Sequence, residues 1–268
     1  SFMKRPKRKQ SSNVQYLLFE DMIVDVEKTD ESVIDMQNSL LTKYSTKLID
    51  SSDVGLETNK IYCGDTVETM GKINEGTVDL ILTSPPYLAS IRQDNHKYPG
   101  AKDQIKDNQS VDDYLEWIVE NFKQYERILK KDGVVVFNFS YTTFNPSLPY
   151  FLINEVFNHT DFRIYDTFAW KKKSAMPVSG HPNRVTRIVE MVYIFAKTPY
   201  FKANKTVSSV SRTGQKYYNN YYNFIEARNN DGKVEGHEAT FSTDFASFFI
   251  DLYSKENEIV LDNFSGTG

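Results

Sequence analysis

The stretch VDLILTSPPY, residues 78–87, decides the fold that we expect for this chain. Its first six residues are mostly apolar and have the length of a short strand. The Ser-Pro-Pro that follows ends regular structure, because proline fixes φ and has no backbone N–H to donate. A continuous apolar run of this length is typical of a strand buried on both faces of a sheet. We therefore expect a buried strand over 78–83 that leads into a rigid loop.

The segments after this loop alternate between helix and strand patterns. Ser110 has the spacing of a capping box to Asp113, and apolar residues then recur at helical spacing as far as Leu129. We expect Gly133 to end this helix. Further strands are expected over 134–139, 165–171, 190–196 and 259–262, with another helix over 239–252. This alternation predicts an α/β fold with a largely parallel sheet.

Two segments lack a sustained pattern and suggest a division of the chain. Residues 1–58 are polar and mixed in charge, and we expect an N-terminal extension with a short helix over 14–26. Residues 198–236 form an insertion that includes the run YYNNYY at 217–222. The expected parts are therefore the extension 1–58, a catalytic part 59–197, the insertion 198–236 and the beginning of a second part at 237–268.

Composition narrows the class of protein. The chain of 268 residues is 40% hydrophobic and 25% charged, and no apolar run is long enough to cross a bilayer, so we expect a cytoplasmic protein without a membrane partner. Its single cysteine, Cys63, excludes an internal disulfide and a cysteine-based zinc site, and we expect no metal. The net charge of −4 argues against nucleic-acid binding over the whole surface, but the basic residues are bunched, as at 4–9 and 171–173.

The loop over 84–87 is the first candidate site. It lies at the carboxyl end of a predicted parallel strand, where open α/β sheets bind their ligands. The oxygens of Ser84 and Pro85 are acceptors suited to an exocyclic amino group, Pro86 stiffens the loop, and Tyr87 offers a flat face to a base. A simple Pro-Pro turn with a core tyrosine explains the same residues, so this loop alone leaves both readings open.

The second candidate is VLDNFSGTG at 260–268, a strand that breaks into a turn with two glycines. Gly266 and Gly268 would let the backbone approach a nucleotide-like ligand closely, and a helix opening there would point its amino end at that ligand. An ordinary tight turn has the same pattern.

Together, TSPPY at 83–87 and DNFSGTG at 262–268 resemble the DNA amino-methyltransferases, in the permuted group whose catalytic motif precedes the cofactor motif. Lesser landmarks follow in the family's order across residues 60–268: IYCGD at 61–65, LKKDG at 129–133, WK at 170–171, EMVY at 190–193 and HEATF at 237–241. The resemblance implies a Rossmann-like, S-adenosyl-L-methionine-dependent methyltransferase sheet in circularly permuted order, with 198–236 as a small target-recognition insertion.

The resemblance also implies roles for individual residues. The catalytic set is Ser84, Pro85, Pro86 and Tyr87, and the cofactor set is Asp262, Phe264, Gly266, Gly268, Asp65 and Phe241. For Asp65, capping of the following helix is an equal alternative. The implied reaction is direct methyl transfer to N4 of a cytosine flipped out of double-stranded DNA, in a restriction-modification system with a cognate endonuclease. Adenine N6 is the alternative target, since the family's adenine enzymes more often have Asp where this chain has Ser84.

The sequence departs from the family at one point. The family's glycine-rich turn continues into a helix and a strand that ends in an acidic residue for the cofactor ribose, whereas this sequence stops at Gly268. We therefore expect a truncated cofactor part, and two alternatives stay open: a second chain completes the cofactor site, or the chain is a catalytically incomplete DNA-binding subunit. A protein-glutamine or RNA methyltransferase ranks last, because in those enzymes the cofactor motif normally precedes the catalytic loop.

Overall fold

A computed structural model of the chain describes residues 15–20, 51–88, 109–142, 145–175, 177, 182–231 and 241–265. Among the helices in these ranges, none has the length and apolarity to span a bilayer. The elements in chain order are β1 (Gln15–Glu20), α2 (Ser51–Val54), β2 (Lys60–Cys63), α3 (Thr66–Met70), β3 (Val78–Thr83), α4 (Val111–Ile128), β4 (Leu129–Asn138), α5 (Leu148–His159), β5 (Arg163–Lys172), β6 (Val189–Ala196), β7 (Val207–Val210), β8 (Lys216–Tyr218), β9 (Phe224–Ala227), α6 (Thr243–Tyr253) and β10 (Ile259–Asp262).

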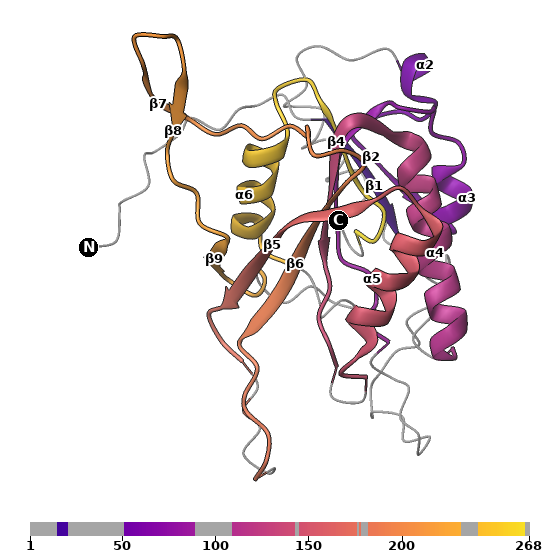
Figure 1. The fold of residues 1–268 in the computed structure, drawn as a ribbon. Coiled ribbons are helices and arrows are strands. Elements are labelled where there is room, and N and C mark those ends of the chain that lie inside the picture. The colour runs from indigo at the N-terminus through magenta and orange to yellow at the C-terminus, as the bar shows by residue number, and fades with distance from the viewer. Residues whose placement is uncertain are drawn as a thin grey trace.

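Eight of these strands form one sheet in the order β2-β1-β10-β3-β4-β6-β5-β9 (Figure 1). The five strands from β2 to β4 are parallel to one another, β6 is antiparallel to both its neighbours, and β9 is parallel to β5. The strand β10, near the end of the chain, therefore lies directly beside β3. The predicted α/β fold with a largely parallel sheet is confirmed, and the antiparallel strand β6 is a feature that the sequence did not predict.

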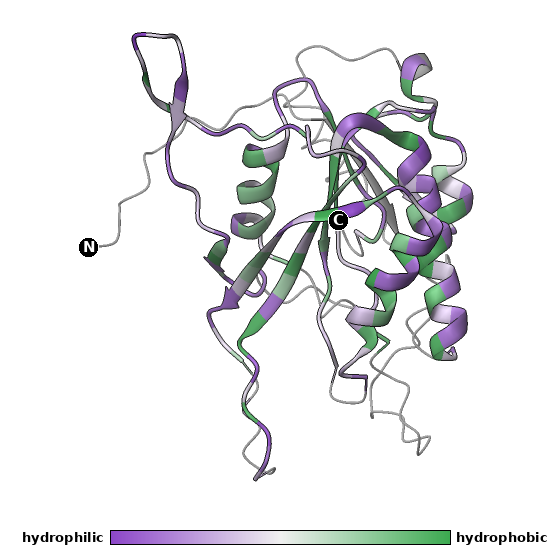
Figure 2. Cartoon of the chain, viewed as in Figure 1, coloured by the Kyte–Doolittle hydropathy of each residue, from purple (hydrophilic) through white to green (hydrophobic). Residues whose placement is uncertain are grey.

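The sheet has an apolar core on each face. Side chains alternate over the second half of β3, so that Ile81 packs in the core with α3, α4 and α5, whereas Leu80 and Leu82 pack with α6. An irregularity in the pairing of β3 with β4 between Val78 and Leu80 goes with Val78 joining the core of Ile81. Figure 1 shows these helices on opposite sides of the sheet, and Figure 2 shows polar residues on the outward surface of α4. Burying each of these side chains contributes about 1.5–3 kcal/mol. The two covered faces leave the ends of the strands as the exposed places for a ligand.

The helix predicted after Ser110 is confirmed, but its end is not where we expected it. The Ser110 hydroxyl accepts from the Asp113 backbone N–H at 3.1 Å, which completes the predicted cap. The helix then ends at Ile128, and Gly133 lies inside β4. A Cβ at Gly133 would lie 2.7 Å from the Asp79 carbonyl oxygen. The glycine permits close approach of two strands. Our prediction that Gly133 ends the helix was therefore wrong.

The other predicted strands are confirmed as β3, β4, β5, β6 and β10, and the last helix as α6. The helix expected over 14–26 is wrong, because residues Gln15–Glu20 form β1 between β10 and β2. A short apolar run suits a buried strand as well as a helix, and only the partner strands decide between the two.

The directions of the strands define two edges of the sheet. β3, β4 and β5 end at one edge, which we call the Ser84 edge, and the β5–β6 connection also lies there. β6 ends at the opposite edge, and the β7–β8 hairpin follows on that side, as Figure 1 shows. The predicted insertion 198–236 is therefore far from Ser84 over 207–218. It returns with β9, which pairs with Ala169–Lys172 at the end of β5 and so ends at the Ser84 edge. Residues 232–236 lie outside the described part of the chain.

Candidate active site

The loop after β3 is held in an unusual backbone conformation. Pro85 is buried, and the Pro86 carbonyl accepts from the Tyr114 hydroxyl at 2.6 Å. Leu88 is fully buried with a φ of 53°, a left-handed value that costs a non-glycine residue about 1–2 kcal/mol. Among the described residues no donor reaches the Pro85 carbonyl. The loop is thus fixed by its surroundings, and within the described part of the chain its Pro85 carbonyl keeps its capacity to accept a hydrogen bond.

Polar groups from three strands meet around the hydroxyl of Tyr87. This hydroxyl lies 3.1 Å from both Asn138 Oδ1, at the end of β4, and Glu190 Oε2, at the start of β6. Ser84 Oγ lies 3.5 Å from the same hydroxyl and 3.4 Å from Asn138 Oδ1. Glu190 also forms an ion pair with Lys172 of β5. The predicted catalytic loop is therefore one side of a polar cluster that the Ser84 edge brings together.

The ring of Tyr87 is part of the core rather than a free surface feature. It meets Phe139 edge-on, with ring centroids 5.1 Å apart, and it is only partly exposed. Burial first, and then the nearby charge of Glu190, raise the pKa of Tyr87 well above its usual range. The hydroxyl therefore keeps its proton at physiological pH. Stacking of this ring on a base stays a prediction.

Asp262 connects the two sequence motifs. Thr83, the residue before Ser84, donates from its hydroxyl to Asp262 Oδ1 at 2.7 Å, and the Phe264 backbone N–H donates to the same oxygen at 3.0 Å. Burial raises the pKa of Asp262 to about 6. Both of these hydrogen bonds go to Oδ1 of Asp262. Within the described residues, the other carboxylate oxygen, Oδ2, could therefore accept a hydrogen bond from a ligand. The two predicted motifs are thus joined directly by a hydrogen bond.

The turn after β10 is fixed by a buried amide. Asn263 Nδ2 donates to Thr66 Oγ1 at 2.7 Å and to Asn121 Oδ1 at 3.2 Å, and its Oδ1 accepts from the Tyr125 hydroxyl at 2.8 Å. The ring of Phe264 packs against Trp117 at a centroid distance of 5.3 Å. A carboxylate with one unused oxygen, beside a half-buried aromatic ring on a fixed turn, suits a cationic, partly apolar ligand such as S-adenosylmethionine.

The remaining predicted cofactor residues are less closely joined to this turn. Asp65 is exposed and accepts from the Glu68 N–H at 3.0 Å, so the helix-capping alternative is observed for it. Phe241 packs on Phe245 at 5.1 Å, on the α6 face of the sheet. Gly266 and Gly268 lie outside the described residues. The cofactor roles of these four residues stay predictions.

Three residues of the cluster were absent from the sequence-based site: Asn138, Glu190 and Lys172. Asn138 ends β4 directly after the apolar run Val134–Phe137 and is buried at 2% exposure. Burying an amide side chain costs free energy unless its hydrogen bonds are made. An asparagine directly after an apolar run was therefore a signal in the sequence for a polar site. Glu190 and Lys172 resemble ordinary surface charges in the sequence, so only the pairing of β5 with β6 shows where they lie.

Comparison with known proteins identifies the family to which the chain belongs. A family model described as DNA methylase, for N6 and N4 methyltransferases, matches residues 78–268. The type II methyltransferase M.BglII of Bacillus subtilis is 26% identical over 234 residues, which cover 78% of this chain and 60% of that protein. M.SfiI of Streptomyces fimbriatus is 26% identical over 163 residues, covering 54% and 37% respectively. The chain thus spans from about a third to three fifths of these two relatives.

A solved structure has a similar fold. The PvuII DNA methyltransferase, described as cytosine-N4-specific, superposes with a TM-score of 0.57 at 22% identity and covers 75% of this chain and 72% of its own. Together with the family match over both motifs, this agreement shows that the chain belongs to the DNA methylase family, the S-adenosylmethionine-dependent N6 and N4 amino-methyltransferases.

Proposed function

We propose that this protein transfers a methyl group from S-adenosylmethionine to N4 of cytosine at a specific site in double-stranded DNA, as part of a restriction-modification system. The observation that carries the proposal is the 2.7 Å hydrogen bond from Thr83 to Asp262. Ser84 follows Thr83 directly, so the group that binds the base and the group that binds the donor are held beside each other. Adjacent, fixed binding sites favour a direct transfer between two bound substrates.

On the acceptor side, Ser84 Oγ and the Pro85 carbonyl would accept the two hydrogens of the amino group. The nitrogen lone pair of such a group is delocalised into the ring, and two well-placed acceptors favour a more tetrahedral nitrogen whose lone pair can attack. The new bond from nitrogen to the methyl carbon would form as the bond from that carbon to sulfur breaks, and the methylated nitrogen would then release one of its protons to solvent. Because both acceptors belong to one fixed loop, they would also aim that lone pair. A base within the duplex does not reach this loop, so the target nucleotide would be flipped out.

On the donor side, Asp262 Oδ2 would hold a cationic group and Phe264 would line the apolar wall. When bound, S-adenosylmethionine supplies a methyl group attached to a positively charged sulfur. The half-buried carboxylate would fix the donor's position, and the turn at Asn263 would keep that carboxylate in place through its contacts with α3 and α4.

Cytosine N4 is preferred over adenine N6 as the target for two reasons. The loop has Ser84 where the family's adenine enzymes more often have Asp, and the structural neighbour of the same fold is described as cytosine-N4-specific. Adenine N6 is the alternative target, and a catalytically incomplete DNA-binding subunit that needs a second chain is the alternative of a different class.

DNA would lie against the Ser84 edge, since the flipped base enters there. Lys173, Arg184 and Arg187 of the β5–β6 connection are at this edge, and Arg187 is fixed by its hydrogen bond to the Tyr141 carbonyl at 2.9 Å. Such side chains suit contacts with DNA phosphates. The insertion 198–236 stays our candidate for target recognition, and β9 with residues 228–231 is the described part that returns to this edge.

The test is to incubate the protein with S-adenosylmethionine and DNA of mixed sequence, and to analyse the nucleosides by mass spectrometry. N4-methylcytosine supports the proposal, and N6-methyladenine corrects the target base. Binding of DNA without any methylated nucleoside would favour the incomplete subunit. Ser84→Ala is the control variant, because it removes the Oγ that would accept a hydrogen bond from the base but keeps the packing of the loop.

A further inference from the structure

The hydrogen-bond donors and acceptors around Ser84 form an ordered chain. Asn138 Nδ2 donates to the Met191 carbonyl at 3.1 Å, and this fixes its Oδ1 toward the loop as an acceptor. The Glu190 carboxylate is also only an acceptor. With two acceptors at 3.1 Å, the Tyr87 hydroxyl has to donate its hydrogen to one of them. Its oxygen is then free to accept from Ser84.

The direction of the Ser84 hydroxyl follows from this arrangement. Among the described residues, the hydrogen-bonding partners within 3.5 Å of Ser84 Oγ are the Tyr87 oxygen and Asn138 Oδ1, and both accept. The Ser84 hydrogen therefore points into the protein, and the lone pairs of Oγ point outward. An outward acceptor matches an amino group, whereas the carbonyl oxygen at the same position of thymine or guanine would meet an unfavourable lone pair.

Glu190 is the charged end of this chain and is itself held in place. Lys172 forms an ion pair with Glu190 Oε1 and lies 4.9 Å from the Trp170 ring centroid. The two side chains of the pair are only 24% and 20% exposed. One carboxylate oxygen thus contacts the lysine, which leaves Oε2 for Tyr87. The raised pKa of Tyr87 agrees with a hydroxyl that remains a donor.

We propose that Glu190, held by Lys172, is a positioning residue that acts through Tyr87 to keep Ser84 Oγ an acceptor for the amino group of the target base. This inference rests on the proposed function and adds to it the residues that determine selection of an amino group. It gives the tyrosine hydroxyl a role that a stacking ring alone does not need.

The experiment is a double-mutant cycle with Glu190→Gln and Tyr87→Phe, measured as the single-turnover rate of methyl transfer to DNA of mixed sequence. In Glu190→Gln the amide oxygen faces Lys172, so the amide N–H faces Tyr87 and replaces an acceptor with a donor. We expect a rate about tenfold lower with little change in KM for DNA. In the Tyr87→Phe background the same substitution should have almost no further effect, because the hydroxyl through which it acts is gone.

A matched control is available on the exposed face of α4. Lys123 forms an ion pair with Glu120 at 2.7 Å, so Glu120→Gln alters a lysine–glutamate pair away from the Ser84 edge and from the insertion. It should leave the rate unchanged. Glu190→Asp keeps an acceptor-only carboxylate and should recover part of the lost rate.

Two results would overturn the inference alone. One is an active wild-type protein whose rate is unchanged by Glu190→Gln. The other is a double variant whose loss of rate equals the product of the two single losses, since Glu190 would then act independently of Tyr87. A wild-type protein that transfers no methyl group refutes the proposed function, and the inference with it.

Discussion

Replacing Asp262 by asparagine should stabilise the folded protein near neutral pH while weakening binding of the methyl donor. The Asp262 carboxyl is buried enough to raise its pKa from 3.8 to about 6, so at pH 7 the fold holds a charge that burial disfavours. Asparagine removes this charge. Its Oδ1 is still able to accept from the Thr83 hydroxyl and the Phe264 N–H, so both observed hydrogen bonds are retained.

The size of the effect follows from the difference in pKa. A raised folded-state pKa means that the folded protein binds the Asp262 proton more tightly than the unfolded chain does. The contribution of Asp262 to the free energy of unfolding is therefore fully present below about pH 3.8, and it is lost as the pH rises through about 6. A shift of roughly two pKa units corresponds to about 3 kcal/mol. Because Asp262 keeps some exposed surface, we expect a gain of about 1.5–3 kcal/mol from the substitution at pH 7.

The assay is urea unfolding of wild type and Asp262→Asn between pH 5 and 7.5, with Asp251→Asn on exposed α6 surface as the control. The difference between wild type and Asp262→Asn should shrink steadily as the pH falls toward 5. Donor affinity, measured by calorimetric titration with S-adenosylmethionine, should drop at least about tenfold through loss of a charged hydrogen bond. A variant that is no more stable than wild type at pH 7 would refute this reasoning about burial.

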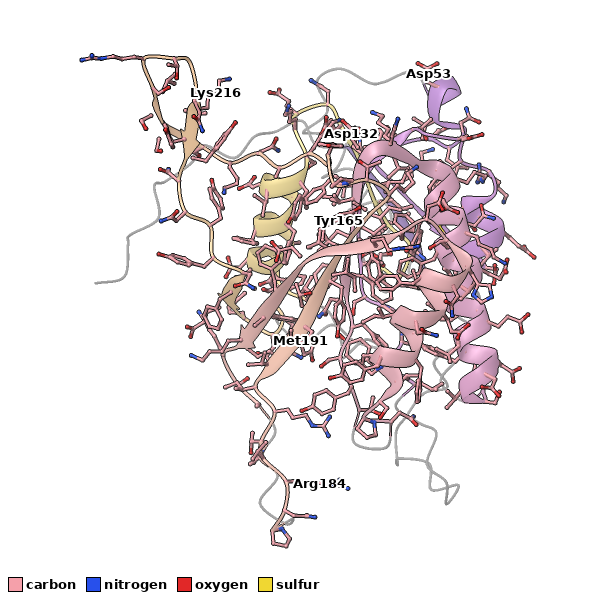
Figure 3. All side chains as sticks on the ribbon, in the orientation of Figure 1. Asp53, Asp132, Tyr165, Arg184, Met191 and Lys216 are labelled. Carbon is pink, nitrogen blue, oxygen red and sulfur yellow. The ribbon has the colours of Figure 1, made fainter. Side chains whose placement is uncertain are left out.

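Three further outcomes are expected. Tyr87→Phe should keep donor affinity within about twofold but slow methyl transfer about tenfold in single-turnover assays; an unchanged rate would mean that the ring only stacks. Asp79→Ala should cost about 2–4 kcal/mol in urea unfolding, because this 1%-exposed carboxylate contacts Lys130 at 2.8 Å and accepts from a backbone N–H of β10 at 3.0 Å. Figure 3 places Arg184 and Lys216 at opposite ends of the molecule, so Arg184→Gln should reduce the salt dependence of DNA binding by about one phosphate contact, whereas Lys216→Gln should not. The reverse result would place DNA on the β7–β8 side.

The local elements were predictable because their signals are local. The apolar run before Ser84 and the cap at Ser110 each depend on neighbours a few residues away, and the structure confirms both. Gly133 was misread because a glycine after a helix suits either a helix end or a close strand contact. The strand at Gln15–Glu20 was misread because a short apolar run fits both kinds of element.

The sequence by itself determined the family, the kind of sheet and the two motifs, since each motif is a contiguous set of residues with a specific spacing. Only the tertiary structure decided how those motifs meet. The contact of Thr83 with Asp262 joins residues 179 apart, and that of Tyr87 with Glu190 joins residues 103 apart. Contacts over such separations depend on which strands are neighbours and in which direction they run. No local pattern carries that information, and so Glu190 became part of the site only through the position of β6 beside β4.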